Sequence, residues 1–348
     1  MIYKKVNIEA FGYELAPEII TSDDIEKRLE PLYKRLKLPA GRLEMMSGIR
    51  ERRLWKHGTM PSEAATLAGI KALQNSRIRK EDIGCLIMCS VCRDFLEPAS
   101  ATVVHSALGL PEDALVFDIS NACLGIMTGM ITAANMIELG QIKAALLVAG
   151  ENSRPLLEST MKVMLDDKEL TRQSIKKYFS SLTIGSGSVA VVLADSRISH
   201  ANHRFIGGYS LAVTSHNKLC RGNADRGMGD NIETLMSTDS EELMLKGVEV
   251  AASTWKLFKK ELGWTEGTPD CFCTHQVGSA HRKLMYETLG IDMSKDFPTL
   301  SFLGNVGSVS CPITTAMAIE AGKVKPGQKL AMLGIGSGIN CTMLGVEW

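Results

Sequence analysis

The sequence has no excess of charge of either sign, since its 348 residues include 39 Lys and Arg against 39 Asp and Glu. A net charge of zero removes the bulk electrostatic argument for a protein that binds nucleic acid or an anionic membrane surface. Apolar residues make up 45% and charged residues 22% of the chain, which excludes a disordered chain and a collagen-like repeat. The length suits two domains or one large α/β domain.

Secretion signals are also lacking. Residues 3–9 read YKKVNIE, with no apolar segment and no cleavage site after it, and neither end carries a lipidation motif. The nine cysteines are an odd number in a large chain, and most lie in apolar runs. We therefore expect a cytoplasmic protein with reduced thiols rather than a disulfide framework.

Two long windows lack charge altogether, yet neither suits a membrane. Ile119–Ile137 and Phe297–Ile319 contain no Asp, Glu, Lys or Arg, but both hold Ser, Asn, Thr and several Gly. Their hydropathy is too low for a span in lipid, so we expect no membrane span. They predict helices that are buried on all sides at the centre of a large protein.

Similar apolar, strand-like runs surround each window. These runs are 85–91, 144–150 and 188–194 around the first window, and 271–277, 330–335 and 341–346 around the second. The order strand, buried helix, strand, strand therefore occurs twice, and strands apolar on both faces predict helices on both sides of each sheet. We expect a duplicated α/β unit with halves at residues 1–196 and 197–348. Further helices are expected at 62–74 and 241–262, and a solvated insertion at 164–179.

Cys123 is the first candidate for chemistry, because it lies where the first buried helix should begin. A helix N-terminus carries a partial positive charge that favours a thiolate, although a free cysteine in an apolar run is commonly a core residue. His275 follows the hydrophobic run 270–274, at the strand end where α/β sheets place their sites. The alternative for His275 is a hydrogen-bonded core histidine. The other six histidines are interpreted as surface or structural residues.

Asn305 lies in the sequence Gly-Asn-Val-Gly at the entrance of the second buried helix, as the pseudo-symmetric counterpart of Cys123. Alone, it would be interpreted as a helix cap or turn residue. Together with Cys123 and His275, it gives a nucleophile and two hydrogen-bond donors that can face an oxyanion.

Two further segments follow predicted strands. Gly334–Gly338 is too close to the C-terminus to begin a dinucleotide-binding unit, and it predicts a tight turn whose backbone amides approach a ligand oxygen. Glu97 precedes a proline and an apolar helix, and it is either a base or part of a solvated loop.

The spacing of Cys85, Cys89 and Cys92 matches a radical-SAM iron–sulfur motif. A cluster needs three thiolates that converge from a loop. Here the first two cysteines lie in a predicted strand, and strand alternation points the third to the other face. We therefore expect no metal.

The chain resembles the thiolase superfamily, and within it the ketoacyl synthase III-like condensing enzymes. The segments that carry the resemblance are 47–53 (SGIRERR), 118–124 (DISNACL), 275–277 (HQV), 304–307 (GNVG) and 334–338 (GIGSG). Three more are similar to the OleA-type acyl-CoA condensing enzymes of head-to-head olefin biosynthesis: 90–98 (SVCRDFLEP), 217–223 (NKLCRGN) and 333–341 (LGIGSGINC). Primer-condensing synthases of fatty-acid synthesis usually carry His-Gln-Ala-Asn, whereas Val277 and Gly278 stand here in place of Ala-Asn.

The resemblance implies a five-layered αβαβα fold, a homodimer, and coenzyme A thioesters as substrates with no bound cofactor. It implies that Cys123 accepts the first acyl group, and that His275 and Asn305 bind the thioester oxygen of the second substrate. The backbone amides of Cys123 and Ser337 would hold the first acyl carbonyl oxygen. Glu97 would act as the base in the site of the partner subunit.

The implied reaction is a non-decarboxylative Claisen condensation of two fatty acyl-CoA molecules to a 2-alkyl-3-ketoacyl-CoA, through an acyl-cysteine intermediate. The alternative is a decarboxylative 3-oxoacyl-[acyl-carrier-protein] synthase III that uses an acyl-CoA primer and malonyl carrier protein. A non-catalytic dimer partner or scaffold is the alternative from another class. An acyl carrier protein and the downstream enzymes of a hydrocarbon pathway are further candidate partners.

Overall fold

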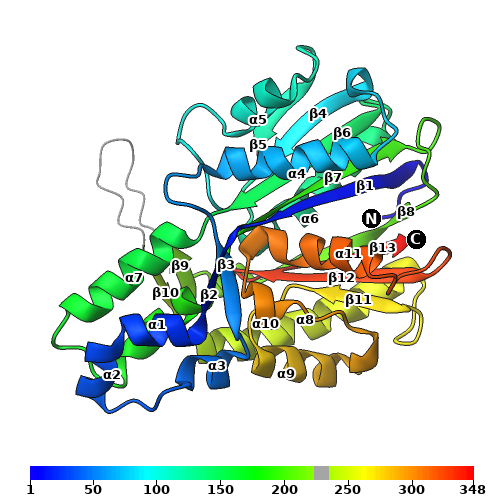
Figure 1. Ribbon diagram of the computed structural model, residues 1–348. Coiled ribbons are helices and arrows are strands. Elements are labelled where there is room, and N and C mark those ends of the chain that lie inside the picture. The colour runs from blue at the N-terminus through cyan, green and yellow to red at the C-terminus, as the bar shows by residue number, and fades with distance from the viewer. Residues whose placement is uncertain (223–234) are drawn as a thin grey trace.

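The computed structural model describes residues 1–222 and 235–348, so Asn223 of the resemblance segment 217–223 lies outside the described residues. Within them, a nine-stranded mixed sheet has the order β11-β12-β13-β8-β1-β7-β6-β4-β5 (Figure 1). Its strands are β1 Val6–Leu15, β4 Ile83–Met88, β5 Leu115–Asp118, β6 Ala144–Glu151, β7 Gly187–Asp195, β8 Arg204–Ala212, β11 Cys271–Thr274, β12 Lys329–Gly336 and β13 Asn340–Glu347. Two small antiparallel pairs are β2 Glu18–Thr21 with β3 Glu51–Leu54, and β9 Cys220–Gly222 with β10 Met236–Thr238.

Helices cover the sheet and fill its centre. They are α1 Ser22–Arg28, α2 Glu30–Leu36, α3 Arg42–Ser47, α4 Pro61–Asn75, α5 Ala101–Leu108, α6 Gly125–Glu138, α7 Arg154–Asp166, α8 Ser240–Leu262, α9 Ser279–Leu289, α10 Leu300–Leu303 and α11 Ser310–Glu320. Two short 3₁₀ helices matter for the site, namely η2 Ala122–Leu124 and η6 Gly307–Val309. In Figure 1, α1, α2, α3 and α7 lie together at one end of the sheet.

Three buried apolar clusters define five layers. The central cluster joins α6 and α11 to the inner faces of both sheet halves. A second cluster packs α4 and α5 on the outer face of β4, β6 and β7, and a third packs α8 and α9 on the outer face of β11 to β13. Side chains of β6 alternate between the two faces of the sheet: Leu147 faces the central helices, while Leu146 and Val148 face the outer helices. The predicted αβαβα architecture is confirmed.

The two sheet halves, β1 to β7 and β8 to β13, are joined narrowly. β1 pairs with β8 at Asn7 and Arg204, and the residues before β1 add a bridge between Ile2 and Gly207, whereas β1 and β7 pair along their full length. The six predicted strand runs correspond to β4, β6, β7, β11, β12 and β13, while β1, β5 and β8 were not predicted. The division into residues 1–196 and 197–348 stays a prediction.

The two uncharged windows hold their long helices, α6 and α11, only in their second parts. In the first window, the residues that follow β5 and the short helix η2 precede α6, and in the second window α10 and η6 precede α11. The long helices therefore begin inside the windows, close to the places expected from Cys123 and Asn305, and the polar and glycine residues before them form the turns that lead into the helices. None of the described helices has the length and apolar character needed to cross a membrane.

The expected helices 62–74 and 241–262 correspond to α4 and α8, and α8 ends at Gly263 in the left-handed conformation. The expectation of a solvated insertion at 164–179 was partly wrong. Met164 and Leu170 are buried, and together with α1 and α2 they form an apolar cluster at the end of the sheet. In the sequence, the charged residues of this segment obscure the regular spacing of its apolar residues.

Gly125 gives the first testable prediction, since a Cβ there would lie 1.9 Å from the backbone oxygen of Cys89. The backbone of Cys89 cannot easily move aside, so Gly125→Ala should lower the free energy of unfolding by about 3 kcal/mol or more. Urea unfolding followed by circular dichroism measures the effect. Gly267→Ala is the matched control, because its Cβ would meet only Thr265 Oγ1 at 4.0 Å. Equal stability of the two variants would contradict the close packing of α6 on β4.

Candidate active site

Cys123 lies in η2, at the N-terminal end of the central helix α6. The preceding Ala122 has a φ of 45°, a left-handed conformation that costs energy in a residue with a side chain. Leu124 is fully buried, whereas Cys123 keeps part of its surface accessible. The strained turn thus points Leu124 into the core and leaves the neighbouring sulfur-bearing residue at its edge.

His275 and Asn305 lie together as predicted. His275 Nε2 is 3.1 Å from Asn305 Oδ1, and the backbone N–H of Gly307 donates to the same oxygen at 3.1 Å. Because a backbone N–H can only donate, this contact identifies Oδ1 as the amide oxygen. It leaves the Nδ2 group of Asn305 without a hydrogen-bond partner among the described residues, and therefore available to a ligand.

Backbone contacts from the other half of the chain hold Asn305. Its N–H donates to the carbonyl of Thr183 at 3.0 Å, and its carbonyl accepts from the N–H of Gly185 at 2.9 Å. His275 is held at the end of β11 by its N–H, which donates to Leu333 at 2.9 Å. The two side chains are therefore placed by different segments, His275 by the pairing of β11 with β12 and Asn305 by residues 183–185 before β7.

Gln276 was missed by the sequence reasoning. Its side chain is buried, and its Oε1 accepts from the N–H groups of Thr299 at 2.9 Å and Leu300 at 2.8 Å. Its Nε2 donates to the carbonyl of Phe297 at 2.9 Å. Gln276 thus ties the strand end beside His275 to the segment that leads to Asn305.

The second half of the chain also closes over Cys123. The helices η2 and η6 contact each other, which brings the turn of Cys123 against the segment that follows Asn305. A Cβ on Gly336 would lie 3.4 Å from the backbone nitrogen of Cys123, so the turn after β12 packs on this backbone. Asn340 Nδ2 donates to Asn121 Oδ1 at 2.8 Å from the far side of the turn. The role of the Ser337 amide in this turn stays a prediction.

The electrostatics of Cys123 differ from the expectation of a stabilised thiolate. Burial, together with smaller contributions from the nearby Glu151 and Cys220, raises the pKa of the thiol to about 12, against a lowering effect of the thiol's own backbone amide. Loss of hydration and a neighbouring carboxylate therefore outweigh the helix N-terminus. The resting sulfur is a thiol at neutral pH.

Burial also keeps the neighbouring imidazoles neutral. It lowers the pKa of His275, against a smaller raising effect of the hydrogen bonds with Asn305 and the backbone of Ile335. Burial and the adjacent His275 lower the pKa of His281, on α9, to about 4. The site thus holds a thiol and two uncharged imidazole rings.

Glu97 lies on a loop between β4 and α5 that is fixed at both ends. Asp94 accepts from the N–H of Ser62 at 2.9 Å, and the Asp94 N–H donates to the hydroxyl of Ser100 at 2.9 Å. Ser100 N–H in turn donates to Asp118 at 2.9 Å. Glu97 itself is exposed and makes no polar contact with Cys123, His275 or Asn305 within the described chain.

A cavity of about 100 Å³ lies at the carboxyl ends of β4 and β5. Its lining comes from the strand ends, the start of the Glu97 loop and the segment before Cys123: Met88, Ser90, Cys92, Arg93, Asp118, Ile119 and Ser120. Cys85 and Cys89 are buried, and burial raises the pKa of both thiols. The described residues contain no group of three or more His, Cys, Asp or Glu side chains placed to hold a metal ion.

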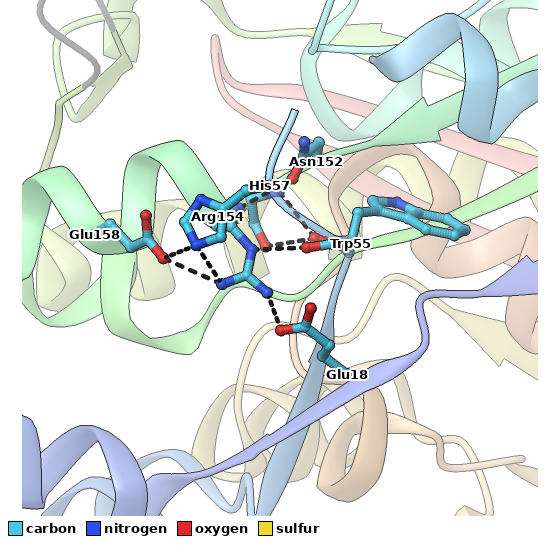
Figure 2. Close-up of polar contacts among 8 residues, drawn as sticks. Glu18, Trp55, His57, Asn152, Arg154 and Glu158 are labelled. Carbon is cyan, nitrogen blue, oxygen red and sulfur yellow. Dashed lines mark hydrogen bonds and ion pairs between the residues drawn. The ribbon is translucent and has the colours of Figure 1, made fainter. Parts of the chain in front are cut away.

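A buried arginine joins three segments at the start of α7. Arg154 begins α7 and is 5% exposed, and Figure 2 shows its guanidinium between Glu18, His57, Glu158 and the backbone of Trp55. Its Nε donates to the Trp55 carbonyl at 2.6 Å, and Nη1 donates to Glu158 at 3.1 Å. Nη2 forms an ion pair with Glu18. This clamp joins β2, the segment after β3 and α7; no sequence pattern had indicated it.

Comparisons with known proteins agree with this architecture. Residues 117–209 match the family 3-oxoacyl-[acyl-carrier-protein] synthase III, and residues 260–348 match the C-terminal part of that family. The acyl-CoA:acyl-CoA alkyltransferases of Shewanella oneidensis and Xanthomonas campestris are 41% and 38% identical, with 100% of each chain covered. The beta-ketoacyl-[acyl-carrier-protein] synthase III of Koribacter versatilis is 24% identical, over 99% of this chain and 98% of that protein.

Solved structures lead to the same group. A crystal structure of Xanthomonas campestris OleA with one cysteine replaced by alanine has a TM-score of 0.94 and 38% identity, covering 100% of this chain and 98% of that one. A variant with serine at a cysteine, bound to lauric acid and lauroyl-CoA, has a TM-score of 0.93 and 37% identity, covering 99% and 100%. The chain belongs to the ketoacyl synthase III-like group of the thiolase superfamily and, within it, to the acyl-CoA:acyl-CoA alkyltransferase family.

Proposed function

We propose that the protein joins two fatty acyl-CoA thioesters by a non-decarboxylative Claisen condensation, giving a 2-alkyl-3-ketoacyl-CoA. The observation that carries the proposal is the His275–Asn305 pair, together with the contact between η2, which holds Cys123, and η6, which follows Asn305. The relatives support it, since a cysteine variant of the Xanthomonas OleA binds lauroyl-CoA. Variants at a glutamate and a histidine of that protein match the residue types of Glu97 and His275.

The first step is a thiol–thioester exchange. The Cys123 sulfur attacks the acyl carbonyl, the bond to the coenzyme A sulfur breaks, and the Cys123 proton leaves with the departing coenzyme A thiol. The backbone amides of Cys123 and Ser337 stabilise the oxyanion that forms on the way. Because burial keeps Cys123 protonated, the sulfur of the resting site reacts slowly with other electrophiles.

The second step forms the carbon–carbon bond. Glu97 of the partner subunit takes an α-proton from the second acyl-CoA, and His275 and Asn305 stabilise the enolate oxygen. Each such donor is worth about 3 to 4 kcal/mol in the transition state. The enolate carbon attacks the acyl-Cys123 carbonyl, and the Cys123 sulfur leaves and regains a proton.

A homodimer is part of the proposal, because Glu97 is exposed in its own chain. Its loop also exposes three apolar side chains, with Val91 at 49%, Phe95 at 44% and Leu96 at 47%. The adjacent β5 ends the sheet on this side, and an uncovered edge strand is a template for pairing with another chain. A second copy on this face would cover the apolar residues and bring Glu97 to a site. The nine free cysteines support a cytoplasmic location.

A decarboxylative synthase remains the second candidate, because the family matched by residues 117–209 carries that name. Its second substrate would be malonyl carrier protein, and it would release carbon dioxide without needing Glu97 as a base. The downstream enzymes of a hydrocarbon pathway stay candidate partners of the condensing enzyme.

Replacement of the nucleophile tests the proposal directly. Cys123→Ala should release no coenzyme A from long-chain acyl-CoA and form no condensed product, because the acyl acceptor is gone. A thiol assay and mass spectrometry of the protein and the products measure this. Cys220→Ala is the control, since it removes another half-buried thiol. Undiminished product from Cys123→Ala would exclude the proposed mechanism, and carbon dioxide release from malonyl carrier protein would favour the decarboxylative one.

Complementation tests whether Glu97 acts across the dimer. Glu97→Ala should still acylate Cys123 but should not condense, because only the α-proton transfer is blocked. Mixed dimers of Glu97→Ala with Cys123→Ala should regain condensation, since one site then combines an intact Cys123 with the partner's intact glutamate. Product formation by the two variants alone and after mixing under exchange conditions gives the answer. A lack of recovery in verified mixed dimers would mean that Glu97 does not serve the partner's site.

The state of the resting thiol gives a pH prediction. The thiolate fraction rises about tenfold per pH unit below the pKa, so alkylation of Cys123 by iodoacetamide should still rise steeply between pH 7 and 9. The pKa of Cys123 lies near 12, hence no plateau is expected in this range. A short unstructured cysteine peptide, whose thiol pKa is about 8.5, is the control, and its alkylation rate should level off above pH 9. A plateau for Cys123 below pH 8 would show a stabilised thiolate instead.

A further inference from the structure

Glu151 is a buried carboxylate that takes no part in the reaction steps described above. It is the last residue of β6 and is 5% exposed, in the middle of the region where the site loops converge. Burying a carboxylate costs folding free energy unless hydrogen bonds compensate for the lost water. The hydrogen-bond partners of Glu151 therefore indicate what its side chain does.

The two oxygens of Glu151 hold two separate loops. Oε1 accepts from the N–H of Val91 at 2.8 Å, and Oε2 accepts from the N–H of Cys92 at 3.1 Å. These residues begin the loop that carries Glu97. Oε1 also accepts from the hydroxyl of Ser308, which lies in η6, three residues after Asn305. A single carboxylate therefore connects the loop of the base to the segment of an oxyanion donor.

The surroundings admit this carboxylate at close range. A Cβ on Gly307 would lie 3.5 Å from Cδ and from Oε1 of Glu151, an ordinary van der Waals distance, so the carboxylate packs directly beside η6. The backbone of Glu151 is fixed independently, because its carbonyl accepts from Trp55 Nε1 at 3.1 Å and its strand pairs with β7 at Gly187. The strand end would therefore keep its place if the carboxylate were changed.

We propose that Glu151 is a positioning residue for the condensation step, because its carboxylate fixes the Glu97 loop and the Asn305 segment relative to each other. The inference rests on the proposed condensation. Acylation of Cys123 does not need Glu97, so it does not depend on this connection. Condensation needs the base and the oxyanion donors at the same substrate, where small displacements are costly.

The negative charge of Glu151 supplies an independent readout. The carboxylate is near enough to Cys123 to contribute to the raised pKa of that thiol. Replacing Glu151 by an uncharged side chain should lower this pKa and move the alkylation profile of Cys123 to lower pH. A residue that served only as packing would leave the profile in place.

Glu151→Gln is the decisive variant, since it keeps the size of the side chain. It removes the charge and places an NH₂ group against one of the three donors. We expect acylation of Cys123 in a single turnover to be retained, kcat for condensation to fall about tenfold or more, and the alkylation profile to shift to lower pH. Glu249→Gln, on the exposed face of α8, is the matched control and should change none of these.

Two more variants separate charge from geometry. Glu151→Asp keeps the charge but shortens the reach, so condensation should fall while the alkylation profile stays near that of the unchanged protein. Ser308→Ala cuts one link without touching the carboxylate, and it should lower condensation alone. If the unchanged protein condenses and all three variants condense at its rate, the inference is wrong; if the unchanged protein does not condense acyl-CoA, the proposed function itself is wrong.

Discussion

Burial of the charge-free helices α6 and α11 between the two sheet halves is the constraint on which the site depends. Each helix can enter the centre only through a turn, and the two turns, η2 and η6, contact each other. Cys123 lies in the first turn, and Asn305 lies just before the second. The candidate site therefore lies at the turns through which the two apolar helices enter the core, and the close packing of the core holds these turns in place.

The same burial sets the charge state of the site. Loss of water raises the pKa of Cys123 and lowers the pKa values of His275 and His281, so a thiol and neutral rings are favoured together. The carboxylate of Glu151 adds to the effect on the thiol while its hydrogen bonds hold two loops. Structure and electrostatics are thus linked through one side chain, and a change at Glu151 alters both.

Much of the layout was predictable because it follows from residue pattern. Uncharged windows and repeated apolar runs indicated central helices and a duplicated sheet, and the segments around Cys123, His275 and Asn305 followed from their places at helix and strand ends. Glu151, Gln276 and Arg154 were missed, because their partners are backbone groups and side chains far away in sequence. The thiol state was mispredicted, since a helix end is visible in a sequence while desolvation is visible only in the packed structure.

Asn305 is fastened by its own backbone to Thr183 and Gly185, which belong to the other half of the chain. One half thus supplies the amide group and the opposite half holds it in place, so the position of this side chain depends on both halves. A chain break near residue 184 would therefore be expected to displace the Asn305 side chain even if both sheets stayed folded.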